Sequence, residues 1–462
     1  MKNKSLILLI LTLFWLSIAF GTANTARAGA TITVNTTNDE LDNDGNCSLR
    51  EALRAVNLRQ AVDACPAGIC SDTIILPVGT YMLTILGTGE DASLTGDLDI
   101  LSDVTINGTG ASSTIIDGNG DVTKDRVFHV ISATVTISGM TIRNGKPSGA
   151  SDSGGGIYNA GGTLTLLDSV VVNNIATEIP ISGFGGGISV DNFGRLVVAN
   201  SIISGNTAAY GGGISSWFSP VTVTNSIISN NTVNIFGGGI YNHDGALVIS
   251  DSTLNRNSAI QYGGGIWTLI ANYGSFSMTN TTISSNHAND LGGGIYNAGS
   301  AGLNNVTITN NTVNGGGPNG GGGMGLAPTS SGGVPIYLKM KNSIVAGNQD
   351  LSGNGPDCLG VLFSENHNLI QNTTGCTITG TMTNDLIGWN PLLGTLASNG
   401  GTTPTHALLP GSPAIDAGDD ATCAATDQRG ITRPQATRCD LCAFEYVGAI
   451  HRLSFPLYSK LH

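Results

Sequence analysis

A triplet of consecutive glycines recurs along the middle of this chain and limits the folds that it can adopt. The first glycine of each triplet is Gly154, Gly185, Gly211, Gly237, Gly263, Gly292 or Gly321, with steps of 31, 26, 26, 26, 29 and 29 residues. An asparagine column keeps the same period, at Asn174, Asn206, Asn231, Asn257, Asn286, Asn311 and Asn348. Such self-similarity indicates a repeat architecture, in which each unit packs only on its neighbours.

Each repeat has the length and composition of one coil of a β-solenoid. Segments such as "LVVANSIIS" and "VTVTNSIIS" are rich in Val, Ile and Thr, which favour strands over helices. A period near 26 residues accommodates three short strands and three turns, and successive coils would stack about 4.8 Å apart. We therefore predict an all-β parallel β-helix of roughly ten coils over residues 76–355.

The glycine and asparagine columns are expected to be structural. Glycine allows stacked backbones to approach closely, and a turn asparagine tolerates left-handed dihedrals while its amide bonds to the asparagine of the next coil. Neither column resembles a phosphate-binding loop, since no Walker lysine or helix follows the triplets.

Composition excludes some partners. The chain has 462 residues, only 11% of them charged, and a formal net charge of -13. Nucleic acid would repel such a chain, and after the N-terminus no apolar run reaches the roughly 20 residues of a spanning helix. We expect a monomer without a nucleic-acid partner and without a transmembrane segment once the leader is removed.

Residues 1–28 have the features of a secretory signal peptide. Lys2 and Lys4 precede an apolar stretch over residues 6–20, and a small-residue cleavage site ends at Ala28. We expect secretion or display at a bacterial cell surface; an uncleaved membrane anchor is the alternative. Either way the rest of the chain leaves the cytoplasm, where disulfides are permitted.

The eight cysteines lie outside the repeats, toward the two ends, where a solenoid has no neighbouring coil and benefits from covalent links. The preferred disulfide pairs are Cys47–Cys65, Cys358–Cys376 and Cys423–Cys439. Cys70 and Cys442 remain, and their places toward opposite ends of a rod argue against their pairing. A zinc site is the competing interpretation, although close Cys/His pairs in register are missing.

Residues 29–75 are expected to cap the N-terminal end of the solenoid. Ser48 and Glu51 have the spacing of a capping box, which predicts a helix over about residues 49–57. Its apolar face would cover the first coil.

The same segment contains a partial calcium-loop pattern. Glu40, Asp42, Asp44 and Glu51 are candidate ligands, with Gly45 at the sixth position. The first ligand is Glu rather than Asp, and a strand-like segment precedes it. No cofactor is otherwise required.

An aromatic column follows the triplets. The residue after each inward apolar position is Tyr158, Ser189, Ser215, Tyr241, Trp267 or Tyr296, and strand alternation is expected to point it outward. Trp217 lies close by. Tyr158, Trp217, Tyr241, Trp267 and Tyr296 are therefore candidates for stacking on sugar rings; the alternative is a stack that only shields the sheet.

A catalytic constellation is not evident between residues 140 and 350. The best candidates there are Asp244, Asp251 and Arg256, with His243 alongside. Asp251, however, holds a repeat position that is Asn200 and Asn225 in preceding coils, which favours a ladder role. A lyase would need a base beside calcium, and a hydrolase would need paired carboxylates.

Two motifs resemble known bacterial families. Residues 47–52 read CSLREA, the signature of the CSLREA domain, and residues 356–446 resemble the choice-of-anchor Q domain, with Cys442 where that family usually carries Gly. The stretch between them is similar to pectin-lyase-like right-handed parallel β-helices, and its GGGI repeats resemble polymorphic outer-membrane passenger domains. The resemblance implies a secreted or cell-surface protein. No sortase-type motif follows; residues 447–462 form a tail that could serve in sorting.

Together these features favour a structural or adhesive surface protein that binds glycans, with polysaccharide or cell-envelope components as partners. The alternative is a polysaccharide lyase or glycoside hydrolase acting on uronic-acid polymers. A third possibility is a spacer without a ligand. Fold alone does not decide among them.

Overall fold

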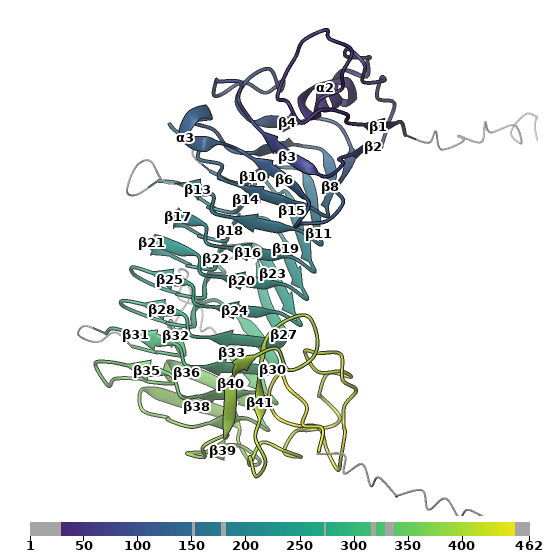
Figure 1. Cartoon of the computed structure of the whole chain (residues 1–462). Helices are drawn as coiled ribbons and strands as arrows, with labels where there is room; N and C mark the ends of the chain where they lie inside the picture. The colour runs from purple at the N-terminus through teal and green to yellow at the C-terminus, as the bar shows by residue number, and fades with distance from the viewer. Residues whose placement is uncertain are drawn as a thin grey trace, which may run out of the picture.

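The computed structural model describes residues 29–149, 153–176, 182–271, 274–315, 320–328 and 337–448. The chain winds into an all-β parallel solenoid of about 10 turns, with β1 (Thr31–Thr33) and β39 (Leu386–Ile387) toward opposite ends of a rod (Figure 1). The boundaries predicted between cap, rod and C-terminal region stay predictions.

Stacked strands of successive coils form four ladders, numbered here in the order in which the chain visits them. The first ladder follows the glycine triplet in each coil that has one. It contains β4 (Leu98–Ile100), β7 (Phe128–Ile131), β10 (Ile157–Ala160), β14 (Ile188–Asp191), β18 (Ile214–Trp217), β22 (Ile240–His243), β26 (Ile266–Leu269), β29 (Ile295–Ala298), β32 (Met324–Leu326) and the start of β36 (Cys358–Glu365).

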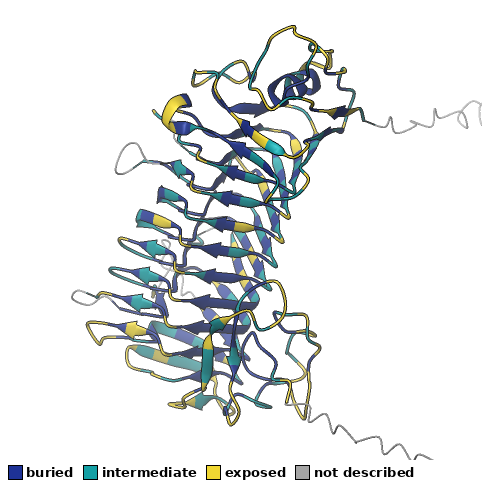
Figure 2. Cartoon of the chain, viewed as in Figure 1, coloured by how far each residue is buried: buried dark blue, intermediate teal, exposed yellow. Residues whose placement is uncertain are grey.

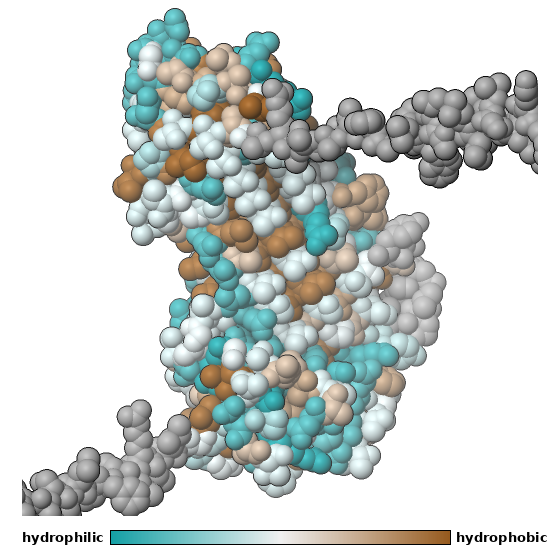
Figure 3. All heavy atoms as spheres, turned by 90° about the vertical axis from the view of Figure 1, so that its right-hand side faces the viewer, coloured by the Kyte–Doolittle hydropathy of each residue, from teal (hydrophilic) through white to brown (hydrophobic). Residues whose placement is uncertain are grey.

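The second ladder lies on the right in Figure 1. It contains β1 (Thr31–Thr33), β2 (Asp72–Ile75), β5 (Val104–Asn107), β8 (Thr134–Ser138), β11 (Thr163–Leu167), β15 (Arg195–Ala199), β19 (Val221–Thr224), β23 (Ala246–Ser250), β27 (Ser275–Ser284), β30 (Ala301–Thr309), β33 (Leu338–Lys341), β36 and β38 (Cys376–Thr381). Figure 3 looks at that side and shows brown apolar patches along the rod among paler and teal residues.

The third ladder follows a sharp corner. It contains β3 (Gly79–Met82), β6 (Thr114–Asp117), β9 (Thr141–Arg143), β12 (Val170–Val172), β16 (Ile202–Ser204), β20 (Ile227–Ser229), β24 (Thr253–Asn255), the second halves of β27 and β30, β34 (Ile344–Ala346), β37 (Leu369–Ile370) and β39 (Leu386–Ile387).

A short fourth ladder differs from the expected three strands per coil. It contains β13 (Ile175–Ala176), β17 (Thr207–Tyr210), β21 (Thr232–Phe236), β25 (Ser258–Ala259), β28 (His287–Ala288), β31 (Thr312–Val313) and β35 (Gln349–Asp350). It arises because the chain runs extended between the asparagine turn and the next glycine triplet. Outside the solenoid, β40 (Leu393–Ala397) and β41 (Thr405–Leu408) form an antiparallel pair.

The core fills the inside of the coils. Equivalent apolar residues pair in register from coil to coil, as in the run Ile188, Ile214, Ile240 and Ile266, all fully buried. Figure 2 shows buried positions alternating with more exposed ones along the stacked strands. Period-two alternation therefore assigns one residue in two to a continuous column of apolar contacts.

The predicted asparagine ladder is confirmed. From Asn206 onward, the buried side-chain oxygen of each asparagine accepts hydrogen bonds from the backbone N–H and the Nδ2 of the preceding asparagine in the ladder. Asn257 Oδ1, for example, lies 3.1 and 2.9 Å from these two nitrogens of Asn231. The ladder runs from Asn174 through every asparagine of the column to Asn348, whose amide reaches Asp357 Oδ1 at 2.9 Å.

The glycine triplets have two separate causes. The first glycine is left-handed, as at Gly237 with φ of 71°. The second has no room for a side chain, because a Cβ on Gly238 would lie 2.4 Å from the carbonyl oxygen of Gly264 in the next coil. A left-handed backbone at the first position and close backbone approach at the second are therefore the reasons for the repeated triplet.

The N-terminal end is covered by helix α2 (Leu49–Leu58), which packs against β2 and β4. The predicted capping box is present: Ser48 Oγ accepts from the backbone N–H of Glu51, and Glu51 Oε2 accepts from that of Ser48. Arg50 is buried and pairs with Asp39 at 2.5 Å. A short helix α3 (Gly120–Thr123) lies further along the chain, and no helix in these parts of the chain is long and apolar enough to cross a membrane.

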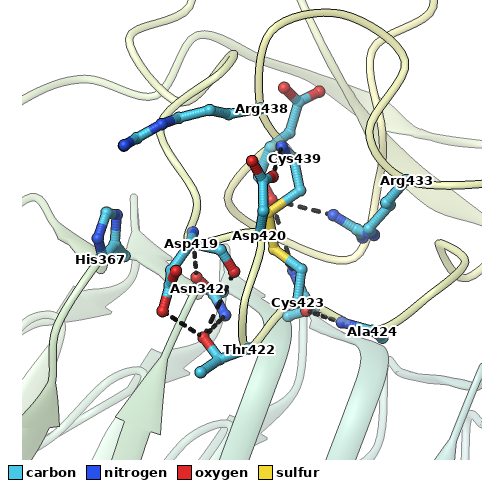
Figure 4. Close-up of a disulfide and its surroundings, with 12 residues drawn as sticks. Asn342, His367, Asp419, Asp420, Thr422, Cys423, Ala424, Arg433, Arg438 and Cys439 are labelled. Atoms are coloured by element: carbon cyan, nitrogen blue, oxygen red, sulfur yellow. Dashed lines mark hydrogen bonds between the residues drawn. A yellow bond between two sulfur atoms is a disulfide. The ribbon is translucent and has the colours of Figure 1, made fainter.

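The C-terminal region folds back along the rod beside β27 and β30 (Figure 1). Figure 4 shows Asn342 beneath it: its Oδ1 accepts from Asp419 N at 2.9 Å, and its Nδ2 donates to Thr422 Oγ1 at 3.0 Å. Gln428 Nε2 also donates to Thr253 Oγ1 at 2.9 Å. This region therefore closes the corner between the second and third ladders over several coils.

All three predicted disulfides form, Cys47–Cys65, Cys358–Cys376 and Cys423–Cys439. Cys70 and Cys442 are not bridged to each other. The buried Cys442 has φ of 89°, a conformation that favours glycine.

We expect the stability of the C-terminal region to fall as pH rises. Burial raises the pKa of Asp440 to about 7, with the Glu445 charge adding to the rise and hydrogen bonds from Tyr446 and Asp416 opposing it. A carboxyl whose pKa is higher in the folded than in the unfolded state stabilises the fold fully below its unfolded-state pKa, near pH 4. This contribution, at most about 4 kcal/mol, is lost as pH rises through 7. Denaturant unfolding at pH 5 and pH 8 should give a lower free energy of unfolding at pH 8. In Asp440→Asn the difference between the two pH values should be smaller. Equal stability at both pH values would contradict this expectation.

Candidate functional site

The outward positions of the first ladder form one continuous column, which we call the outward column. Register places Asp99 beside His129, then Tyr158, Ser189, Ser215, Tyr241, Trp267 and Tyr296 on successive coils. The sequence identified the column only from Tyr158 onward. Its first two members lie in "LDI" and "FHVI", which share the apolar-x-apolar pattern but follow no glycine triplet.

The C-terminal half of the column is covered, which differs from the expected exposure. Tyr241 and Trp267 stack with centroids 4.5 Å apart and are only 4% and 7% exposed. The residues just before the triplets build a second aromatic column against them; Phe236 stacks on Trp267 at 5.3 Å, and Tyr210 lies 5.3 Å from Tyr241. The two aromatic columns together shield the sheet. The aromatic residues directly before the triplets, such as Tyr210 and Phe236, were the sequence signal that the outward rings would be covered.

An open hollow lies where the outward column lacks rings. Ser189 and Ser215 occupy two successive coils there, and the resulting space of about 430 Å³ is the aromatic hollow. It is lined by Ser153, Phe184, Ser189, Asp191, Asn192, Phe193, Ser215, Trp217 and Phe218. Phe193 is 79% exposed and Trp217 is 38% exposed, so apolar rings face solvent at its rim.

Neighbouring groups fix the walls of the aromatic hollow. Trp217 stacks on His243 with centroids 4.2 Å apart and planes 4° from parallel. Asp191 Oδ2 accepts from the Tyr158 hydroxyl at 2.7 Å, while its buried Oδ1 has no hydrogen-bond partner in the described part of the chain. Burial raises the pKa of Asp191, and the hydrogen bond from Tyr158 opposes that rise. The exposed rings of Trp217 and Phe193, with polar side chains in the same lining, suit an amphipathic ligand.

A second, polar pocket adjoins the hollow at Tyr158. Its space of about 490 Å³ is lined by Asp91, Asp125, Arg126, His129 and Tyr158, together with the loop residues Thr88, Gly89, Pro147, Ser148 and Gly149. His129 stacks on Tyr158 at 5.0 Å, and the Arg126 guanidinium lies 5.2 Å from the centre of the same ring. This cluster precedes the first triplet. It therefore lies outside residues 140–350, the range in which the sequence offered catalytic candidates.

Acidic groups dominate the surroundings of the polar pocket. Arg126 Nη1 pairs with Asp97 Oδ2 at 3.1 Å. Burial raises the pKa of Asp97 well above its usual range; repulsion from Asp125 adds to this, and Arg126 opposes it. Burial also raises the pKa of Asp125. Buried carboxyls of raised pKa beside a cleft are candidate proton donors.

The structure does not bring the predicted catalytic candidates together. Asp251 and Arg256 occupy left-handed corners on either side of β24, with φ of 51° and 55°. Asp244 lies in the corner after β22, where its Oδ1 accepts from Ala271 N at 2.6 Å. Asp251 Oδ1 accepts from Asn280 Nδ2 at 3.1 Å, one coil away, which agrees with the ladder role.

The predicted calcium ligands do not converge either. Asp44 turns back onto Asn46, accepting from its backbone N–H and its Nδ2, and Glu51 is buried in the capping box at the third position of α2. Among the described residues the group with metal-ligand geometry is Asp91, Asp99 and His129, which contains neither these acids nor Glu40 or Asp42. The calcium loop stays a prediction without a converged ligand set.

Comparison with known proteins addresses the fold. Residues 179–350 match the family model described as right handed beta helix region. The solenoid is therefore a right-handed β-helix. Its structure is similar to that of pectate lyase Pel9A, with a TM-score of 0.50 and 15% identity over 91% of this chain and 97% of that one. No curated protein matches in sequence. At this identity the likeness shows a shared β-helix fold and no shared activity.

Proposed function

We propose that this chain is a secreted or cell-surface β-helix protein that binds polysaccharide in the aromatic hollow and so has an adhesive or structural role. The observation that carries the proposal is the exposure of Phe193 and Trp217 around the two-serine gap between Tyr158 and Tyr241 of the outward column. The CSLREA and choice-of-anchor Q resemblances and the predicted signal peptide support the placement outside the cytoplasm.

The geometry of the hollow suits a sugar chain. Aromatic faces pack against the apolar faces of pyranose rings, and small hydroxyl and amide side chains in the floor meet sugar hydroxyls. Ser189, Ser215 and Asn192 supply such groups in the lining of the hollow.

The charges near the hollow favour a neutral polymer. Asp191 lies in its lining, and Asp91 and Asp125 line the adjoining pocket, where the cation Arg126 already pairs with Asp97. A uronic-acid chain would bring further carboxylates against these groups, and like charges repel in a partly desolvated site.

The test is retention of the purified chain by neutral and acidic polysaccharides in affinity electrophoresis. We expect a neutral polymer to retard the wild type, and Trp217→Ala to weaken that binding at least tenfold, because loss of a stacked ring removes about 1.5–3 kcal/mol. Phe193→Ala should weaken it less, since that ring is more exposed.

Trp389→Ala is the matched control, because Trp389 is 58% exposed but belongs to the C-terminal region and not to the hollow. It should bind like the wild type. Retention by no polymer, or equal retention of Trp217→Ala in folded protein, would contradict the proposal.

Polysaccharide cleavage is the second candidate, favoured by Asp125, which lines the polar pocket and whose pKa is raised by burial. A raised-pKa carboxyl can protonate a leaving oxygen, but hydrolysis also needs a base across the bond. New reducing ends or unsaturated products from a retained polymer would favour this candidate over simple binding.

A further inference from the structure

We propose that Asp91, Asp99 and His129 form a binding site for a divalent transition-metal ion of the zinc class, at the end of the outward column. This site is distinct from the predicted calcium loop and goes beyond polysaccharide binding. The three side chains come from the Thr88–Leu94 loop, from β4 and from β7, so the coil stacking brings them together.

The distances among the three groups match those of metal ligands. His129 Nδ1 lies 3.3 Å from Asp99 Oδ1 and 3.4 Å from Asp91 Oδ1. Zinc bonds to nitrogen and to carboxylate oxygen are about 2.0–2.2 Å, which places two ligands of a tetrahedral site about 3.4 Å apart. All three ligand atoms lie within 4.8 Å of one another.

The burial of Asp99 is an independent indication of a bound cation. Its side chain is fully buried, and although Oδ2 accepts from Ser93 N at 2.7 Å, Oδ1 has no hydrogen-bond partner among the described residues and faces the His129 ring. A buried carboxylate oxygen is costly unless a cation compensates it, and His129 Nδ1, 3.3 Å away, does so only when the ring is protonated; a metal ion bound by both side chains would do so with a neutral ring. Arg126 is directed to Asp97 instead, at 3.1 Å.

The donor set selects the class of ion. An imidazole nitrogen with two carboxylate oxygens suits zinc and similar first-row metals, whereas calcium prefers six to eight oxygen ligands. The Asp91 side chain is 69% exposed and lines the polar pocket, so a fourth ligand can enter from that pocket. An open fourth position is typical of sites that bind a water or an external ligand.

Equilibrium dialysis of the tag-free chain against Zn²⁺, followed by metal analysis, tests the proposal. We expect one equivalent of zinc per chain, undiminished by millimolar Ca²⁺. Asp91→Asn should lower the affinity at least tenfold. Because Asp91 is exposed, the substitution should leave the fold intact, which circular dichroism checks. His129→Gln should abolish stoichiometric binding.

His287→Gln is the matched control, because His287 bonds to Thr312 and Asn289 on the fourth ladder, away from this site. It should bind zinc like the wild type. Substoichiometric zinc in the wild type, binding unchanged by both Asp91→Asn and His129→Gln, or displacement of zinc by calcium would each overturn the proposal. Zinc binding is measured without polysaccharide, so its outcome is separate from that of the retention test.

Discussion

Replacing Gly238 with alanine is expected to destabilise the solenoid by about 4 kcal/mol or more, or to prevent folding. The added Cβ would lie 2.4 Å from Gly264 O, 2.6 Å from Ser258 N and 2.7 Å from Ser258 O. All three are backbone atoms of the next coil, so no side chain can move aside. Relief would require the coils to separate, which would break bonds such as Gly238 N to Gly263 O at 3.0 Å.

Gly302→Ala is the matched control, because a Cβ there would meet nothing within 4 Å and the residue lies in strand β30. It should leave the midpoint of denaturant unfolding unchanged or raise it slightly, since alanine restricts the unfolded chain. If both variants unfolded at the same denaturant concentration as the wild type, close coil approach would not be the reason for the triplets.

Replacing Asn257 with alanine is expected to cost about 4 kcal/mol of stability. The substitution removes the acceptor for two nitrogens of Asn231 and the donor to Asn286 Oδ1 and Ile228 O, both 2.9 Å away. These groups lie inside the rod, where water cannot replace the lost partners. Each buried group left without a partner costs about 1–3 kcal/mol.

An exposed asparagine provides the comparison. Asn314 Nδ2 donates to Asn289 Oδ1 at 2.8 Å between neighbouring coils, but it lies at the surface, so Asn314→Ala should cost less than about 1 kcal/mol. Thermal and denaturant unfolding of the two variants measure the difference. Equal losses would mean that the inner ladder contributes no more than a surface hydrogen bond.

The repeat pattern was sufficient to predict the solenoid, because period and composition determine how a coil is built. Gly237, Gly238 and Asn231 belong to columns that recur seven times for reasons of backbone geometry, which sequence spacing reports directly. Three disulfides were also predicted from their clustering near the chain ends. The short fourth ladder was missed because its strands, such as Ser258–Ala259, are too brief to produce an alternating pattern.

The candidate site was harder to predict because it depends on contacts between coils. Tyr241 was expected to face solvent, and alternation alone does not show that Tyr210 of the previous coil covers it. His129 and Asp99 belong to the same column but come before the first triplet, and Asp91 comes from a loop. Only the stacking register places these residues together.

The central claim is that the aromatic hollow is the polysaccharide-binding surface. Hydroxyl-radical footprinting of the chain, alone and saturated with the polymer that retains it best, tests this most directly. We expect protection of Phe193 and Trp217, with no change at Trp389, which is exposed on the C-terminal region. Protection of Trp389 with none at Trp217 would place the binding surface elsewhere and contradict the account.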